Sequence, residues 1–451
     1  MGRHVIVGAG RSGLAVARHL AKSGVEALLT DARAEPDESS RRVLESLGVP
    51  AVWGAHPEGL LEGAEALVLS PGVSPSIPFA RAARDRGIPV LGELELAHRA
   101  LRAKDPGARI LAVTGTNGKS TTTDLLGHLL RAGGLPSAAC GNLGTPLLEA
   151  QETAAPGTVY ALECSSYQLE TVSTFHAEGA ALLNLTPDHL ARHGTLEAYL
   201  AAKQRIFLNQ GPEDLQVHPE GHPELAAGAP GQGRTATFGW TGPGGAGSWC
   251  DGEGRLRLRA ADGAEVDLLH RSELRIPGNH NVENALAAVL LASHAGVSVA
   301  SMREGLRTYP GLAHRIAFCG ERDGVKAYND SKGTNVDATL TAIHALPGPL
   351  VLLLGGTDKG ASYAPLIEAL TGKLRRLVFL GEAIPQLQRD LGGLPHDVVP
   401  AFDDAVRHAL ALAEPGDQVL LSPACASFDQ FRNFEERGER FEGLVRAWAA
   451  S

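Results

Sequence analysis

The stretch ARILAVTGTNGKSTTTDLLGHLL, residues 108–130, joins an apolar run, a glycine-rich turn and a helical pattern in direct succession. The run at 110–113 predicts a buried strand, and the residues after the turn predict a helix. Gly118, Lys119 and Ser120 lie between the two. Free backbone N–H groups at a helix start bind phosphate, a lysine reaches the terminal phosphates, and a serine hydroxyl can ligate magnesium. The stretch therefore predicts a phosphate site and indicates ATP as a cofactor.

The glycine spacing of this turn departs from the common phosphate-loop pattern. G-x-x-x-x-G-K-[ST] requires a glycine at position 113, but this chain has Val113 there and its first glycine is Gly115. A Gly-Lys-Ser turn in an ordinary surface loop is the alternative. The flanking strand and helix favour the phosphate site, whose expected nucleotide contacts are Gly115, Thr116, Asn117, Gly118, Lys119, Ser120 and Thr121.

Length and composition indicate several ordinary globular domains. At about 150 residues per domain, a chain of 451 residues predicts three. With 43% hydrophobic and 20% charged residues, the disordered and fibrous classes are excluded. The formal net charge of -10 argues against a nucleic-acid partner, because no basic surplus is available to displace counterions from a phosphate backbone.

The cysteine pattern, the first residues and the length of the apolar runs indicate the cellular compartment of the protein. The five cysteines form no C-x-x-C pair, which favours reduced thiols over disulfides or zinc. The first residues, MGRHVIVGAGRSG, lead directly into a predicted strand, and no uncharged run is long and apolar enough for a membrane span. We therefore expect a cytoplasmic protein with no membrane partner.

Strand and helix patterns alternate along most of the chain, which predicts an α/β fold with parallel sheets. Turn clusters at residues 104–107 and 309–311 predict domains at 1–106, 107–310 and 311–451. The first has a parallel βαβ pattern, the third returns to alternating strands and helices, and the central one carries the phosphate loop. The glycine-rich tract 228–262 is interpreted as hairpins and loops of the central domain, with a flexible linker as the alternative.

The first domain begins with a glycine loop that follows a predicted strand. Residues 8–13, GAGRSG, match G-x-G-x-x-G, and Asp31 follows at about the spacing of a ribose-binding acid. A second turn, residues 70–72, would lie at the same sheet edge. Taken alone, this pattern indicates a dinucleotide-dependent dehydrogenase, but a Rossmann-like domain that binds another nucleotide fits equally well.

Further polar residues end predicted strands of the central domain. Glu163 and His189 are suited to bind a divalent cation, and parallel strand ends would bring them to the edge that carries Lys119. Lys203 lies on an amphipathic helical pattern and, by physics alone, reads as a solvated charge. The amides of residues 277–284 could bind a nucleotide or simply cap a helix.

In the third domain, basic residues lie in or near four predicted strand-end segments, at 314–315, 329–335, 355–360 and 422–440. A single basic residue in a loop is usually a surface residue. Several at the strand ends of an acidic protein indicate anion contacts.

The chain carries a series of motifs in this order: GTNGKST, ECSSYQLE, NLTPDHL, HNVENALAA, AHR, YNDSKGTN, LLLGGTDKG and LSPACASFDQFRNF. Together they resemble the motifs of the peptidoglycan Mur ligases. The resemblance covers the whole chain, and the last motif is most similar to that of the D-glutamate-adding member. It implies three domains: a Rossmann-like domain for the UDP substrate, a central P-loop ATPase domain, and a Rossmann-like domain for ATP and the amino acid. The implied activity is that of a ligase that uses ATP and two magnesium ions to join UDP-N-acetylmuramoyl-L-alanine to D-glutamate through an acyl phosphate. We expect this ligase to be a monomer. The family's phosphate loop has the same shortened spacing.

The resemblance also implies roles for individual residues. It implies catalytic roles for Lys119, His189, Lys203 and Lys332. The implied metal ligands are Ser120, Glu163, His189 and Lys203, the last as a carbamate. The implied nucleotide contacts beyond the phosphate loop are Asn142, His280, Asn284, Arg315, Asp330 and Lys332. The implied substrate contacts are Arg11, Ser12, Asp31, Arg33, Ser70, Gly72, Asn142, Ser165, His189, Thr334, Lys359, Ser427 and Phe434.

Two departures from the family pattern bear on these contacts, Ala32 where a hydroxyl residue is common and Phe428 where leucine is common. A nicotinamide-dependent oxidoreductase is the rival from another enzyme class, and it depends on the first glycine loop. A folate-glutamate ligase lacks the extra first domain, another Mur ligase lacks the last motif, and a non-catalytic nucleotide sensor would lack Lys119, Glu163 or Lys203.

Overall fold

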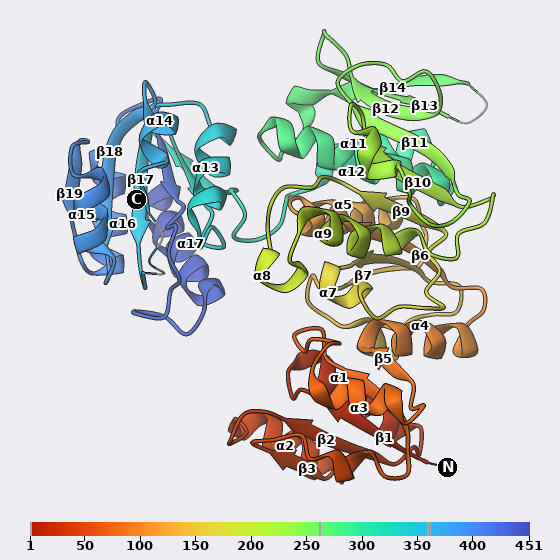
Figure 1. Cartoon of the computed structure of the whole chain (residues 1–451). Helices are drawn as coiled ribbons and strands as arrows, with labels where there is room; N and C mark the ends of the chain where they lie inside the picture. The colour runs from red at the N-terminus through yellow and green to blue at the C-terminus, as the bar shows by residue number, and fades with distance from the viewer. Residues whose placement is uncertain (1, 261–262, 359, 361) are drawn as a thin grey trace. The chain divides into compact units, whose positions relative to one another are not determined.

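The computed structural model describes residues 2–260, 263–358, 360 and 362–451. The chain forms two compact units, one made of Met1–Glu273 with Val282–Arg307 and the other of Leu274–Asn281 with Thr308–Ser451 (Figure 1). Within the described residues the first unit contains two β-sheets and the second contains one.

The first sheet is built from residues 3–92, all of which are described, and its five strands are parallel in the order β3-β2-β1-β4-β5. The central strands are apolar runs buried on both faces, which is typical of parallel sheets. The strands are β1 Arg3–Val7, β2 Ala27–Asp31, β3 Ala51–Trp53, β4 Ala64–Leu69 and β5 Val90–Gly92. The helices are α1 Arg11–Lys22, α2 Glu38–Leu47, η1 Glu58–Leu61 and α3 Pro78–Asp85, and α4 Glu93–Lys104 leads to the second sheet.

The loop between β1 and α1 is the predicted G-x-G-x-x-G turn. Gly8 has a φ of 98°, and a Cβ on Gly13 would collide with the carbonyl oxygen of Gly8. Glycine at both positions lets α1 begin immediately beyond the strand. The loops after β1, β2 and β4 therefore meet at one carboxyl edge, where sheets of this kind bind ligands.

The second sheet has nine strands within the described part of residues 109–270, in the order β14-β13-β12-β11-β10-β9-β6-β8-β7. Strand β6, the apolar run that precedes the Gly-Lys-Ser turn, lies inside it between β9 and β8. The strands are β6 Arg109–Thr114, β7 Ser137–Gly141, β8 Val159–Glu163, β9 Gly179–Leu182, β10 Leu215–Pro219, β11 Arg234–Gly239, β12 Gly247–Cys250, β13 Arg255–Arg259 and β14 Glu265–His270. The helices of this region are α5 Lys119–Ala132, α6 Leu147–Ala150, α7 Ser166–Leu169, α8 Leu190–His193, α9 Leu196–Gln204, η2 Arg205–Phe207, α10 Pro223–Ala226, η3 Arg271–Glu273, α11 Asn279–His294 and α12 Val299–Thr308.

The glycine-rich tract is part of this sheet, which confirms its assignment to the central region and not to a flexible linker. Strand β11 pairs in parallel with β10, and β12, β13 and β14 form antiparallel pairs. The sequence RLRLR of β13 alternates in burial, with Leu256 and Leu258 buried. This alternation is the period-two pattern of a strand with one covered face.

The third sheet lies in the second unit and has six strands among the described residues, in the order β15-β16-β20-β17-β18-β19. The apolar runs LVLLL, RLVFL and QVLL form β17, β18 and β20, as predicted. The strands are β15 Ala317–Arg322, β16 Val325–Asn329, β17 Leu350–Gly355, β18 Leu374–Leu380, β19 His396–Val398 and β20 Gln418–Leu421. The helices are α13 Val336–Ala345, α14 Leu366–Leu370, α15 Ile384–Leu391, α16 Phe402–Leu412 and α17 Phe434–Ala450.

Buried apolar clusters hold each unit together. In the first unit one cluster extends from Ile6 of β1 and Leu20 of α1 to Leu162 of β8 and Phe207 of η2. In the second unit two clusters cover the two faces of the third sheet. No helix in the described chain combines the length and the apolarity that a membrane span needs.

Candidate active site

The phosphate loop connects β6 to α5, as the sequence predicted. Gly118 is the N-cap of α5 with a φ of 82°, a left-handed conformation that favours glycine. The Lys119 ammonium donates hydrogen bonds to the carbonyl oxygens of Gly115 at 2.9 Å and Thr116 at 2.7 Å. It therefore lies across the loop, at the helix start that presents free N–H groups to an anion.

Asn184, in the loop after β9, holds the phosphate loop in place. Its side-chain oxygen accepts hydrogen bonds from the N–H groups of Thr116 at 3.1 Å and Asn117 at 2.8 Å, and its amide donates to the Asn117 carbonyl at 3.1 Å. On the other side, Asn284 of α11 accepts a hydrogen bond from Thr122 at 3.1 Å, and a Cβ on Gly118 would collide with its oxygen. The predicted nucleotide contact Asn284 therefore adjoins the loop.

Lys203 is buried beside the loop, with 1% of its surface exposed. The solvated position that its helical pattern indicates is wrong, because α9 packs so that this face is covered. The ammonium donates to the Gly115 carbonyl at 2.7 Å and lies 4.4 Å from the centre of the Tyr199 ring. Burial, and after it the nearby positive charge of Lys119, lower the pKa of Lys203 to about 7.

Glu163 lies at the end of β8 and is 2% exposed. Its Oε1 accepts a hydrogen bond from the Asn142 side chain at 2.6 Å, whereas its Oε2 is buried and has no hydrogen-bond partner in the described chain. A buried oxygen without a partner is costly unless a ligand satisfies it. Carboxylate and hydroxyl oxygens are hard donors of the kind that magnesium prefers. Glu163 therefore fits a divalent cation.

The remaining predicted metal ligand, His189, is the N-cap of α8 and has a left-handed backbone with a φ of 53°. Its Nδ1 lies 3.1 Å from the Tyr167 hydroxyl. Among the described residues no group of three or more His, Cys, Asp and Glu side chains could enclose a metal by itself. A cation held here would need Ser120, a modified Lys203 or phosphate oxygens to complete its ligands.

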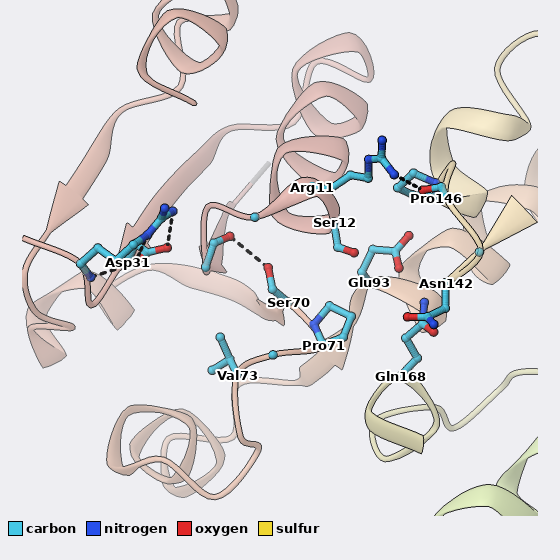
Figure 2. A pocket seen from close by; sticks show the side chains of 16 residues that line it. Arg11, Ser12, Asp31, Ser70, Pro71, Val73, Glu93, Asn142, Pro146 and Gln168 are labelled. Atoms are coloured by element: carbon cyan, nitrogen blue, oxygen red, sulfur yellow. Dashed lines mark hydrogen bonds and ion pairs between the residues drawn. The ribbon is translucent and has the colours of Figure 1, made fainter. Parts of the chain in front are cut away.

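A pocket of about 490 Å³ lies at the carboxyl edge of the first sheet and extends to the second sheet (Figure 2). Arg11, at the start of α1, donates a hydrogen bond to the Gly144 carbonyl at 2.8 Å across this space. The predicted residues that line the pocket are Arg11, Ser12, Asp31, Arg33, Ser70, Gly72 and Asn142. The structure therefore brings all the first-domain substrate contacts to one cavity.

Asp31 organises the far end of this pocket. Its carboxylate accepts hydrogen bonds from the Ala9 N–H at 2.7 Å and from the Arg33 N–H at 2.9 Å, and it pairs with the Arg33 guanidinium at 3.1 Å. Burial opposes ionisation of the carboxyl, but these hydrogen bonds lower the pKa of Asp31 below its usual value. Asp31 thus carries a negative charge and fixes the glycine loop.

Ser165 has a structural partner that the sequence did not predict. Its hydroxyl accepts the Gln168 N–H at 3.3 Å and the two residues form a capping box at the start of α7. Ser165 therefore orients α7, whose Gln168 lines the pocket.

In the second unit the predicted contacts collect around the carboxyl ends of β16 and β20. The Lys332 ammonium lies 5.0 Å from the centre of the Phe434 ring. Asp330 accepts a hydrogen bond from the Ser422 hydroxyl at 2.7 Å, and burial raises the pKa of Asp330 to about 7. Arg315 contributes an attractive charge to Asp330.

Arg437 of α17 connects these loops and is almost fully buried. Its guanidinium donates to the Ser331 carbonyl at 2.8 Å, and to the carbonyls of Cys425 and Ala426 at 3.2 Å each. It therefore ties the segment carrying Lys332 and Thr334 to the one carrying Ser427. His280 also belongs to this unit, and Lys359 lies outside the described residues.

Three family models match consecutive parts of the chain. They are the Mur ligase MurD-like, N-terminal domain over residues 2–92, the Mur ligase middle domain over 113–292 and the Mur ligase, glutamate ligase domain over 314–425. The UDP-N-acetylmuramoylalanine--D-glutamate ligase of Pelotomaculum thermopropionicum is 41% identical over 449 residues, 98% of this chain and 96% of that protein. The protein of that name from Myxococcus xanthus is 42% identical over 460 residues, 99% of this chain and 98% of its own. The chain belongs to the Mur ligase family.

Solved Mur ligase structures have the same fold. The UDP-N-acetylmuramate-alanine ligase MurC of Thermotoga maritima matches with a TM-score of 0.60 at 18% identity, with 100% of both chains covered. MurF from Acinetobacter baumannii matches with a TM-score of 0.61 at 17% identity, covering 98% of this chain and 93% of that one. These likenesses confirm the predicted α/β Mur ligase fold, and the family uses ATP.

Sequence reasoning missed several residues of this Mur ligase that the structure places in or beside the sites. Asn184 belongs to the motif NLTPDHL, but the sequence pattern indicated no role for it. The pattern also did not indicate roles for Glu93, Gln168 and Arg437. Glu93 follows a short strand directly, as strand-end residues of such sites do, and this position could have identified it. Arg437 lies in a segment rich in charged residues, a composition typical of an exposed surface, so the sequence gave no indication that it is buried.

Proposed function

We propose that this chain joins D-glutamate to UDP-N-acetylmuramoyl-L-alanine with ATP as the energy source, yielding ADP and phosphate in the synthesis of peptidoglycan precursors. The observation that carries this proposal is the match over nearly the whole length to D-glutamate ligases at about 40% identity. The arrangement of the phosphate loop, Glu163 and the pocket of the first sheet supports it.

In this proposal the UDP portion of the substrate occupies the pocket lined by Asp31, Ser70 and Arg11. The alanyl end points toward Asn142, because Asn142 is hydrogen-bonded to Glu163 at the edge that also carries the phosphate loop. One carboxylate oxygen of the alanyl group attacks the γ-phosphorus, and the bond from that phosphorus to the bridging oxygen of ADP breaks. The product of this step is an acyl phosphate.

Positioning and neutralisation of charge are the main requirements of phosphoryl transfer. The backbone from Gly115 to Thr121 and the Lys119 ammonium would bind the β- and γ-phosphates. Magnesium would be held by Ser120, Glu163, His189 and Lys203, and when bound it neutralises negative charge on the transferred group. The further residues that we propose to contact the nucleotide are Asn142, His280, Asn284, Arg315, Asp330 and Lys332.

Lys203 would act as a carbamate. Its burial next to Lys119 favours the neutral amine, whose nitrogen can form a bond to the carbon of CO2 with release of a proton. The change converts a cation into an anion that is able to ligate a metal. It also removes the repulsion between the Lys203 and Lys119 ammonium groups.

The second half-reaction needs the amine of D-glutamate. We assign its binding to Thr334, Lys359, Ser427 and Phe434, with Ser165 and His189 contributing on the substrate side. The amine attacks the acyl carbon, the bond to the phosphate oxygen breaks, and the amide forms. We further propose a monomer that acts in the cytoplasm, and size-exclusion chromatography with light scattering tests the monomer.

The test is phosphate release by the purified protein. We expect release only when ATP, UDP-N-acetylmuramoyl-L-alanine and D-glutamate are all present, with L-glutamate, L-alanine and lysine as controls for the amino acid. Release with another amino acid in place of D-glutamate would contradict the proposed specificity. Release without the UDP substrate would contradict the proposed acceptor.

A further inference from the structure

Glu93, the first residue of α4, is a buried carboxyl with one unsatisfied oxygen in the substrate pocket. It is 2% exposed and lines the cavity. The Gln168 side chain favours its ionised form, but its Oε1 has no hydrogen-bond partner among the described residues. Leaving a buried polar atom unpaired costs free energy, so such an atom in a cavity indicates a missing ligand group.

The electrostatic surroundings of Glu93 do not compensate for its burial. Burial, with a smaller contribution from the negative charge of Glu149, raises the pKa of Glu93 to about 7. Glu149 itself is paired with Arg18 at 2.6 Å. The Gln168 side chain opposes this rise in the pKa but does not cancel it.

The place of Glu93 along the pocket shows which part of a ligand it meets. Figure 2 shows Asp31 at one end and Glu93 at the other, where its side chain extends between Ser12 and the pair Asn142 and Gln168. The Asn142 end leads to Glu163 and the phosphate loop. If the reactive end of a nucleotide sugar points toward Glu163 and its nucleoside lies near Asp31, the sugar portion between them lies beside Glu93.

We propose that Glu93 is a specificity residue for the sugar portion of the nucleotide substrate, and that its unpaired carboxyl oxygen accepts a hydrogen bond from an amide N–H or a hydroxyl of that sugar. A diphosphate in contact with the same oxygen would be repelled, which favours a donor group as its partner. The inference rests on the proposed function, because it takes the bound molecule to be UDP-N-acetylmuramoyl-L-alanine.

Isothermal titration calorimetry of the full chain with UDP and with UDP-N-acetylmuramoyl-L-alanine tests the proposal. Glu93→Leu removes both acceptor oxygens, so we expect about tenfold or more weaker binding of the sugar nucleotide and a change within about twofold for UDP. Glu93→Gln keeps one acceptor oxygen at the same reach and is expected to retain most of the affinity. Glu45→Gln, at an exposed position of α2, is the control for loss of one negative charge from the first domain.

The melting temperature separates this role from a structural one. A carboxyl that only stabilises the fold would lower the melting temperature when replaced, whereas an unsatisfied carboxyl that serves a ligand leaves it unchanged or higher in the ligand-free protein. If the leucine variant does not fold, Glu93→Met carries the same test with an unbranched side chain.

Three outcomes overturn the inference. Equal sugar-nucleotide affinity of wild type and Glu93→Leu would remove the proposed contact. An equal loss for UDP and for the sugar nucleotide would indicate a general packing role. If the wild-type protein binds UDP but not the sugar nucleotide, the proposed function fails and the inference falls with it, an outcome distinct from failure of the Glu93 variant alone.

Discussion

The ammonium of Lys203 lies 2.7 Å from the carbonyl oxygen of Gly115, the first glycine of the phosphate loop. A lysine far along the chain from Lys119 is thus buried against the same loop. Burial is the main cause of the lowered pKa of Lys203, and repulsion from the Lys119 ammonium adds to it.

Lys203→Ala is expected to reduce the rate of phosphate release about 10²-fold or more, because it removes a group that stabilises charge at the reaction centre. Lys203→Arg should be equally impaired, since a guanidinium does not form the carbamate. Lys22→Ala, an exposed lysine paired with Glu152, is the control. Near-normal turnover of either Lys203 variant would refute the proposed role.

Asn184→Ala is expected to weaken ATP binding by about tenfold, because three hydrogen bonds that shape the phosphate loop are lost. The KM for ATP and direct titration with ATP measure this effect. The affinity for UDP should not change, since the pocket proposed for UDP lies at the first sheet. An unchanged KM for ATP would show that the loop keeps its shape without Asn184.

Asp31→Asn is expected to weaken UDP binding by about tenfold, because the neutral amide loses the ion pair with Arg33 and one of its oxygen acceptors. Calorimetric titration with UDP measures the loss, and ATP affinity provides the internal control. Full UDP affinity in the variant would place the nucleoside away from this end of the pocket.

The stability of Glu93→Gln relative to wild type should depend on pH. The pKa of Glu93 is raised from 4.5 to about 7 in the folded protein, so the folded state binds the proton more tightly than the unfolded state. Its destabilising contribution therefore grows as pH rises from about 4.5 to 7 and then levels at about 3 kcal/mol. Thermal melting of both proteins at pH 5 and pH 8 should show a larger gain for the variant at pH 8. A gain that is equal at the two pH values would contradict the raised pKa.

Arg437→Met is expected to destabilise the second unit by about 3 kcal/mol, because it leaves the carbonyls of Ser331, Cys425 and Ala426 unsatisfied in a buried site. It should also raise the KM for D-glutamate, since these carbonyls adjoin Lys332 and Ser427. Arg446→Met, on the exposed side of the same helix, is the control. An unchanged melting temperature and KM would contradict this role.

The sequence predicted the parts of the fold that depend on local patterns. An apolar run followed by a glycine turn and a helical period gave β1 with α1 and β6 with α5, since these residues determine their own backbone conformation. Short edge strands such as β3 and β19 were not predicted, because three half-buried residues carry too little periodicity. The two-residue turn between β15 and β16 was missed for a similar reason.

For the site, the sequence by itself determined which chemical groups are available: the phosphate loop, the acid at the end of β8, the glycine loop of the first sheet and the family to which they belong. Only the tertiary structure decided that Lys203 is buried, that Glu93 has an unpaired oxygen and that Arg437 joins two loops. The physical reason is that burial and hydrogen-bond partners depend on residues far away in the chain. A helical period predicts the face of α9 that carries Lys203, but it does not say what covers that face.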